Sequence, residues 1–229
     1  MFRTIHNILS PDQLAACRKL IAEASWVDGR ASAGATAARK KNNSEIAKTG
    51  PVLNQLRDVI LGALMSRQEF VATALPARIV SLSFSRYDNG QSYGPHIDAG
   101  IMHDTEGGYV RRVRTDLAAT LFISDPGEYE GGELRMDDPT YGHGNVKLPA
   151  GDIVLYPASS LHWVEPVTKG ARLVSFFWIQ SLVRENSLRS MLQDLDGTIQ
   201  QLNLSSPGNP ASVKLLGLYH NLLRLWSET

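Results

Sequence analysis

The stretch Tyr87–Asp98 reads YDNGQSYGPHID, and it ends in an imidazole and a carboxylate two positions apart. Side chains two residues apart on an extended segment point to the same face, so His96 and Asp98 should lie side by side. Turn-forming residues earlier in the stretch, such as Asn89 and Gly90, bend the chain before it reaches His96 and Asp98. Together the two side chains make most of a metal site that lacks only a second histidine.

The second histidine should come from another strand, and His162 is well placed for that role. It follows the strand-like run GDIVLYP at residues 151–157. Two histidines and one carboxylate on one face of a divalent ion leave coordination positions open, as in non-haem Fe(II) sites. His103 competes as a ligand but falls in residues 99–114, which are predicted to form a loop. We therefore predict that His96, Asp98 and His162 are the metal ligands.

An arginine opens the next apolar strand. Arg172 opens the apolar run ARLVSFFWI ten residues after His162. Its planar, permanently charged fork suits the recognition of a carboxylate. Strand alternation places Val174, Phe176 and Trp178 on the same face as Arg172, so Trp178 is expected to line the same cavity.

These motifs carry a family resemblance. The pattern YxxGxxYxxHxD, with a distal histidine and an arginine ten residues later, resembles the Fe(II)/2-oxoglutarate-dependent dioxygenases and their prolyl/lysyl hydroxylase branch. Over essentially its whole length the chain is similar to the bacterial PKHD-type hydroxylases of the YbiX/PiuC group. The residues that match are Tyr87, Gly90, Tyr93, His96, Asp98, His162 and Arg172.

The resemblance implies a cofactor set and a reaction. Fe(II) would be held by the three ligands, and 2-oxoglutarate would bind the iron and pair with Arg172. Dioxygen is the second co-substrate, and L-ascorbate (vitamin C) is a candidate further cofactor. The implied reaction hydroxylates an unactivated C–H bond and releases succinate and carbon dioxide. Tyr87, Thr120 and Trp178 are expected around the 2-oxoglutarate.

One position departs from the pattern of the relatives. They often carry a tyrosine that shares the distal carboxylate of 2-oxoglutarate, whereas the comparable strand here offers Phe122, with Thr120 beside it. A phenyl ring cannot donate a hydrogen bond. Thr120 or another group is therefore expected to take part in the carboxylate contact.

The substrate is not readable from the motifs. Tyr93 and the basic residues Arg111, Arg112 and Arg114 form a candidate substrate region, with residues 99–114 acting as a lid. The resemblance suggests either a peptidyl prolyl or lysyl side chain or a small molecule related to iron uptake. Two other classes stay open at this point: a cupin-like metal protein with non-oxygenase chemistry, and a non-catalytic sensor.

Short alternating strands separated by Gly and Pro predict a mainly β protein with helical additions, a double-stranded β-helix or cupin-like jelly roll. The expected divisions are an N-terminal helical support (residues 1–76), the jelly-roll core (77–181) and a C-terminal helical extension (182–229). This extension should pack against the barrel or a second subunit, which makes a homo-oligomer a possible assembly. Residues 27–44 read as a loop, and its Arg39-Lys40-Lys41 is most simply a solvated charge run, with contact to an anionic substrate as the alternative.

The amino-acid composition argues against several classes of binding partner and location. The 229 residues carry 23 basic and 23 acidic side chains, and this balance argues against a nucleic-acid binder. No apolar run is long enough for a signal peptide or a membrane span. Cys17 is the single cysteine, which excludes an intramolecular disulfide framework. We therefore expect a cytoplasmic protein that acts on a small-molecule or peptidyl substrate.

Overall fold

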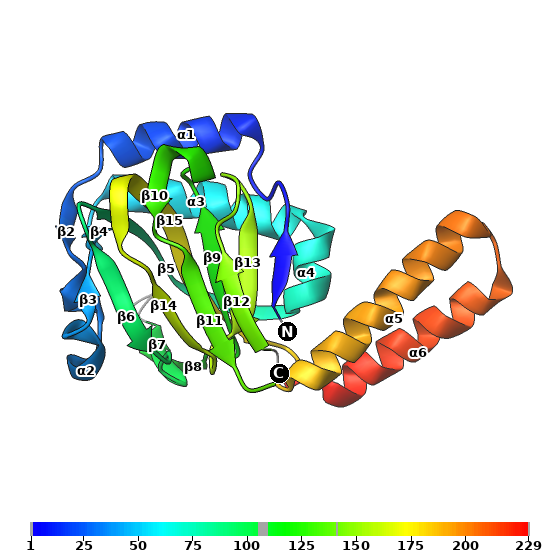
Figure 1. Cartoon of the computed structure of the whole chain (residues 1–229). Helices are drawn as coiled ribbons and strands as arrows, with labels where there is room; N and C mark the ends of the chain where they lie inside the picture. The colour runs from blue at the N-terminus through cyan, green and yellow to red at the C-terminus, as the bar shows by residue number, and fades with distance from the viewer. Residues whose placement is uncertain (1, 105–109, 141, 229) are drawn as a thin grey trace.

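Two antiparallel β-sheets face each other, and helices cover the outer face of the larger sheet (Figure 1). The structure, a computed structural model, describes residues 2–104, 110–140 and 142–228. The larger sheet has the order β1-β13-β9-β15-β5-β4-β2, with β10 paired to β15, and the smaller sheet has the order β12-β11-β14-β6-β3. The predicted jelly roll is confirmed.

The elements have the following bounds. The larger sheet contains β1 (Arg3–Ile5), β2 (Trp26–Asp28), β4 (Ser44–Ile46), β5 (Pro76–Asp88), β9 (Leu117–Phe122), β10 (Tyr129–Gly131), β13 (Ile153–Pro157) and β15 (Val167–Ser181). The smaller sheet contains β3 (Lys41–Asn42), β6 (Ser92–His96), β11 (Leu134–Asp138), β12 (Gly142–Val146) and β14 (Leu161–Val164). The helices are α1 (Pro11–Ala22), α2 (Ala35–Ala38), α3 (Pro51–Ser66), α4 (Gln68–Ala74), α5 (Asn186–Ser205) and α6 (Pro210–Trp226), with 3₁₀ turns η1 (Gly29–Ser32) and η3 (Pro126–Glu128).

Alternation along the strands of the larger sheet separates two apolar layers. In β5, Leu82 and Phe84 face outward and pack with α1 and α3, as the two-residue period predicted. Tyr87 at the end of the same strand belongs to the layer between the two sheets, together with residues such as Leu134 and Val164 from the smaller sheet. The functional cavity lies within this inner layer.

The N-terminal helix starts where the sequence indicated. The Ser10 side chain accepts a hydrogen bond from the backbone N–H of Gln13, and the Gln13 side chain accepts one from the backbone N–H of Ser10. This capping box satisfies two donors at the helix end, and Pro11 occupies the first turn. Cys17 is fully buried on the inner face of α1, and burial raises the pKa of its thiol to about 11.

The prediction of a loop at residues 27–44 was wrong. This segment contains the end of β2, η1, α2 and β3, and it runs into β4. β3 pairs with β6 and β4 pairs with β5. Strands of two or three residues show no period of their own, because the tertiary pairing forms them. Lys41 is correspondingly buried and not solvated, at 5% exposure.

Residues 99–114 also contain more structure than the predicted loop. β7 (Ile101–Asp104) and β8 (Arg111–Arg114) pair with each other as a two-stranded sheet. The centre of the predicted lid, residues 105–109, lies outside the described residues. His103 therefore sits on a strand, although that strand belongs to neither main sheet.

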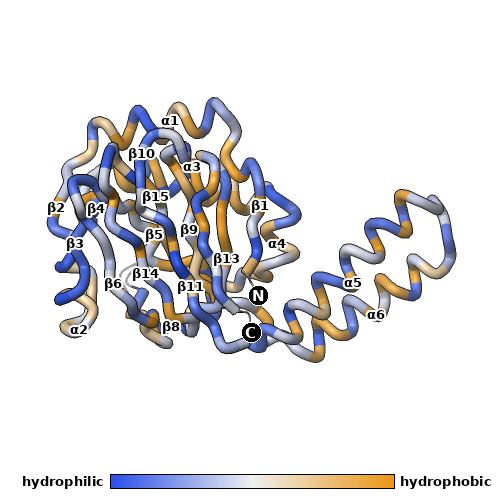
Figure 2. The backbone as a smooth tube through the Cα atoms, viewed as in Figure 1, coloured by the Kyte–Doolittle hydropathy of each residue, from blue (hydrophilic) through white to orange (hydrophobic). Residues whose placement is uncertain are grey.

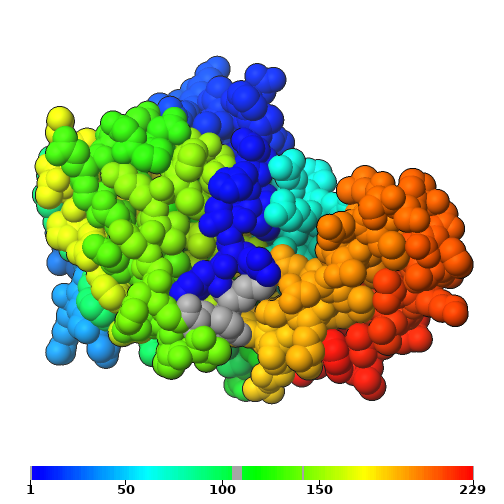
Figure 3. Space-filling view, turned by 45° about the vertical axis from the view of Figure 1, so that its right-hand side comes forward, coloured from blue at the N-terminus to red at the C-terminus, as the bar shows by residue number. Residues whose placement is uncertain are grey.

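The C-terminal helices form an antiparallel hairpin that projects from the barrel (Figures 1 and 3). Hydrophobic and hydrophilic residues alternate along both helices (Figure 2). The hairpin encloses its own apolar cluster, with Leu192, Ile199 and Tyr219 at its centre. Leu204 and Val213 remain exposed. The homo-oligomer expected through these helices stays a prediction. Among the described residues, no helix has the length and apolar character needed to cross a membrane.

Gly170 offers a test of the turn that closes β10 on β15. Its φ is +71°, and a Cβ there would lie 2.1 Å from the Glu128 carbonyl oxygen. We expect Gly170→Ala to lower the free energy of unfolding by about 1–3 kcal/mol. Gly62→Ala is the control: Gly62 lies in α3, and an added methyl group would meet nothing within 4 Å, so this variant should gain about 0.5–1 kcal/mol. Urea unfolding would measure both, and equal effects would contradict the close approach.

Candidate active site

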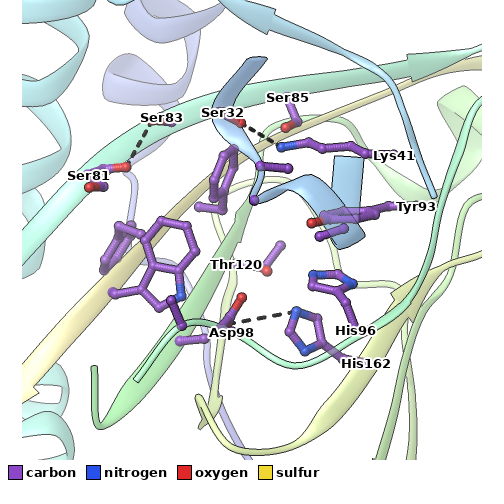
Figure 4. Close-up of a pocket in the computed structure, with 18 of the residues that line it drawn as sticks. Ser32, Lys41, Ser81, Ser83, Ser85, Tyr93, His96, Asp98, Thr120 and His162 are labelled. Atoms are coloured by element: carbon purple, nitrogen blue, oxygen red, sulfur yellow. Dashed lines mark hydrogen bonds and ion pairs between the residues drawn. The ribbon is translucent and has the colours of Figure 1, made fainter. Parts of the chain in front are cut away.

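The register of the smaller sheet brings the predicted metal ligands together. His162 in β14 lies directly opposite His96 at the end of β6, and Asp98 follows two residues later. Ligand atoms of the three side chains all lie within 4.8 Å of one another. Oδ2 of Asp98 lies 3.9 Å from Nε2 of His162 (Figure 4).

Backbone carbonyls fix both imidazoles. Nδ1 of His96 lies 2.9 Å from the Gly94 carbonyl oxygen, and Nδ1 of His162 lies 3.1 Å from the Ser160 carbonyl oxygen. A carbonyl only accepts, so each Nδ1 carries the proton and each Nε2 keeps a free lone pair. The ring of Tyr93 stacks on His96 at 3.7 Å between centroids. The two rings are thus held as neutral ligands.

The electrostatics of the cluster favour a cation. Burial lowers the pKa of His162 to about 4. Burial, together with the nearby His162, lowers the pKa of His96 to about 4. Burial raises the pKa of Asp98, because its carboxylate is poorly solvated. A divalent ion would replace the lost hydration of the carboxylate and use the two free lone pairs, so the donor set fits Fe(II).

Arg172 is a buried cation without an acidic partner in the described part of the chain. It lies in β15 opposite Tyr87 of β5 and is 1% exposed. Its guanidinium lies 5.3 Å from the ring centre of Tyr87 and 5.4 Å from that of Phe122. Among the described residues no carboxylate lies within ion-pair distance, and its Nε has no hydrogen-bond partner. An isolated buried charge is costly, so this group fits the carboxylate of a bound co-substrate.

Two residues beside Arg172 were not predicted. Gly132 leaves room for the arginine, because a Cβ there would lie 3.1 Å from Arg172 Cδ. Burial raises the pKa of Tyr129, and the neighbouring guanidinium acts in the opposite direction. Neither residue stands out in the sequence, since both fall in the turn region DPGEYEGG.

The other residues predicted around the co-substrate line one cavity of about 620 Å³ with the metal cluster and Arg172: Tyr87, Thr120 and Trp178. Burial raises the pKa of Tyr87 to about 12, so its hydroxyl remains a proton donor. Sequence reasoning missed Tyr156, which lines the same cavity from β13, the neighbour of β9. It is buried, and burial raises the pKa of its hydroxyl. The alternation of the run GDIVLYP was the signal that could have found it.

Of the residues predicted to meet the substrate, only some line the cavity. Tyr93 and His103 line it. The arginines of β8 do not appear in its wall: Arg111 and Arg112 are exposed, and Arg114 bonds to Asp116 and Glu228. A role of these arginines in substrate binding stays a prediction, and the guanidinium of Arg114 is already paired with two carboxylates.

Comparison with known proteins places this geometry in a family. Residues 82–180 match the model of the 2OG-Fe(II) oxygenase superfamily, and residues 187–228 match the PKHD-type hydroxylase C-terminal domain. A PKHD-type hydroxylase of Parvibaculum lavamentivorans is 50% identical over 229 residues, which covers 100% of both chains. This chain belongs to the PKHD-type hydroxylases. As a 2OG-Fe(II) oxygenase it is an enzyme that uses Fe(II) and 2-oxoglutarate, which sets aside the sensor and the non-oxygenase metal protein.

Solved structures agree on the fold of this hydroxylase. A Pseudomonas putida prolyl-4-hydroxylase is 17% identical, with a TM-score of 0.51 over 79% of this chain and 92% of that chain. HygX from Streptomyces hygroscopicus was solved with nickel, 2-oxoglutarate and hygromycin B. It is 14% identical, with a TM-score of 0.51, and the match covers 80% of this chain and 84% of HygX. At these identities the likeness concerns the fold alone.

Single substitutions test the ligand set. We expect His96→Ala, Asp98→Ala and His162→Ala each to weaken Fe(II) or Co(II) binding by more than about 100-fold, because each removes a direct ligand. His103→Ala is the matched control, since His103 borders the cavity but lies outside the cluster. Anaerobic metal titration with the full-length protein would measure the affinities. Loss of binding in the His103 variant with retention in any of the other three would refute this ligand set.

Proposed function

We propose that this hydroxylase oxidises an unactivated C–H bond of its substrate while converting 2-oxoglutarate to succinate and carbon dioxide. The observation that carries the proposal is the shared cavity: the His-Asp-His cluster and the buried cation of Arg172 line the same space. Together they can bind a molecule that has a metal-chelating end and a distal carboxylate, as 2-oxoglutarate does. When bound, iron would activate dioxygen, which is the oxidant, and 2-oxoglutarate would supply two of the electrons that dioxygen accepts.

The protein's own residues orient the reactants and exclude water. His96, Asp98 and His162 would hold the iron, and Arg172 would receive the distal carboxylate as a charge-assisted bidentate pair. Phe122 offers Arg172 an apolar face and no hydrogen bond, so the guanidinium keeps its donors for the ligand. Tyr87 and Tyr129 bring hydroxyl-bearing rings beside the same guanidinium, whereas Thr120 lies beside the metal cluster (Figure 4), so its share in the carboxylate contact stays a prediction.

Two substrate classes are compatible with this site. The family suggests a peptidyl prolyl or lysyl side chain, or a small molecule related to iron uptake. Proteins of the same fold include one described as a prolyl-4-hydroxylase and one solved with hygromycin B bound, so the fold itself favours neither class.

The reaction predicts a defined stoichiometry. Fe(II)-loaded protein supplied with 2-oxoglutarate should consume dioxygen and release succinate in equal amounts, for about one turnover without substrate and repeatedly with it. An oxygen electrode and mass spectrometry of succinate would follow dioxygen and succinate in the same sample. Asp98→Ala should abolish both signals. Dioxygen uptake without succinate, or succinate without dioxygen uptake, would reject the proposed reaction.

Arg172→Lys tests the carboxylate contact separately. Lysine keeps the charge but loses the bidentate fork. Losing one charge-assisted hydrogen bond of roughly 1.5–3 kcal/mol should weaken 2-oxoglutarate binding by about one to two orders of magnitude. Fe(II) affinity should hardly change.

Titration of 2-oxoglutarate into the anaerobic Fe(II) protein, followed by its charge-transfer absorption, measures the effect of this substitution. Arg18→Lys is the control, because Arg18 bonds to Glu128 and the Ile123 carbonyl oxygen and does not line the cavity. An unchanged midpoint in Arg172→Lys would remove this arginine from the co-substrate site.

A further inference from the structure

The cavity extends well beyond the metal cluster. At about 620 Å³ it is larger than a small dicarboxylate requires. The remaining wall carries the hydroxyls of Ser81 and Ser83 (Figure 4). It also carries the rings of Phe176 and Trp178. Ser81 has φ +57° and lies at a β-bulge, where β5 contains one residue more than the paired segment of β15. Backbone in this conformation is uncommon for serine and is found at functional sites.

Lys41 places a buried positive charge in this wall. It is 5% exposed, and its ammonium group bonds to the carboxylate of Glu45 and, at 2.8 Å, to Ser32 Oγ. It lies 5.1 Å from the ring centre of Tyr93 and 5.6 Å from that of Phe176. Lys41 lines the cavity whereas Glu45 does not, so the ion pair turns its cationic end toward the cavity.

The other charges around this part of the cavity have the same sign. Lys48 lines it, is exposed, and pairs with none of the acids in the described part of the chain. His103 also lines this part of the cavity. Within residues 2–104, 110–140 and 142–228, Asp98 is the only acidic side chain in the wall, and it belongs to the metal cluster. A cationic group entering here would meet no carboxylate that is free to pair with it.

We propose that the substrate of this hydroxylase is anionic and that Lys41 and Lys48 receive its negative charge. The inference rests on the proposed function, since it concerns the molecule oxidised in that cavity. Charges in a partly desolvated cavity interact more strongly than in bulk water. The two lysines therefore favour a negatively charged substrate even where they do not touch it. A lysyl ammonium is thereby excluded as the reacting group, and an acidic peptide or a carboxylate-bearing small molecule is favoured.

Probes anchored in the co-substrate site can test this preference without knowledge of the natural substrate. N-oxalylglycine mimics 2-oxoglutarate, and N-oxalyl-amino acids project a side chain from it. Calorimetric titration of the Mn(II)-loaded protein would compare the glutamate, glutamine and lysine derivatives, each as both enantiomers. In the better-fitting enantiomer, the glutamate probe should bind about three- to tenfold more tightly than the isosteric glutamine probe. The lysine probe should bind more weakly than the glutamine probe.

Variants assign the preference to the two lysines. Lys48→Met removes an exposed charge and should reduce the glutamate-over-glutamine ratio. Lys41→Met alone leaves Glu45 buried and unpaired, so it should invert the ratio if the protein folds. Lys41→Met/Glu45→Gln removes the whole ion pair without leaving a buried charge, and it should reduce the ratio as well. Lys169→Met is the control, because Lys169 is exposed, pairs with Glu130 and does not line the cavity.

The outcomes distinguish the substrate preference from the proposed function. If the glutamine or lysine probe binds as tightly as the glutamate probe in the wild-type protein, the substrate preference is refuted. A ratio that is unchanged in both the Lys48 variant and the double variant refutes the role of these lysines. Failure of N-oxalylglycine itself to bind would overturn the proposed function, and this inference with it.

Discussion

The pairing of β14 with β6 is the constraint on which the site depends. It sets His162 directly opposite His96, so two ligands from distant parts of the sequence meet on one face of the smaller sheet. Side chains alternate along a strand, so a slip of one residue would turn His162 to the other face and dismantle the cluster. The pairing fixes where each histidine stands but not how its ring is turned. The carbonyl groups of Gly94 and Ser160, each two residues before its histidine, fix the ring orientation. Sheet register places the rings, and local backbone orients them.

A second strand pairing, between β15 and β5, positions the arginine that is proposed to bind 2-oxoglutarate. β15 and β5 run side by side over most of their length, and Arg172 stands opposite Tyr87. The guanidinium is buried between aromatic rings, which satisfy its apolar faces but not its charge. The fold therefore maintains an uncompensated cation at one end of the cavity and a cluster of neutral imidazoles with one carboxylate at the other. With a divalent cation bound to the cluster, both ends of the cavity would be positive, which matches a molecule with a carboxylate at each end.

The sequence was informative where chemistry imposes a spacing, and silent where tertiary contacts decide. His96, Asp98, His162 and Arg172 could be found because ligation and carboxylate recognition require particular residue types on strands. Lys41 could not be placed, because a strand of two residues has no period and its burial results from β6, Glu45 and Ser32. Tyr156 was missed because it lies on β13, a strand that carries none of the motif residues. These residues belong to the cavity wall, whose make-up depends on which elements the fold brings together.

The apolar cluster between α5 and α6 includes no member of the two barrel clusters, so the protein has a satellite core on a projecting arm. The arm attaches to the rest of the protein through Leu75, which joins its cluster, through the pairs Gln193–Thr73 and Asp194–Arg3, and through the bond between Glu228 and Arg114. Such an arm can open as a cooperative unit while the strands around the metal cluster remain closed. Amide protons of α5 and α6 would then exchange at a rate governed by the arm alone, and the chain as a whole would depart from two-state unfolding.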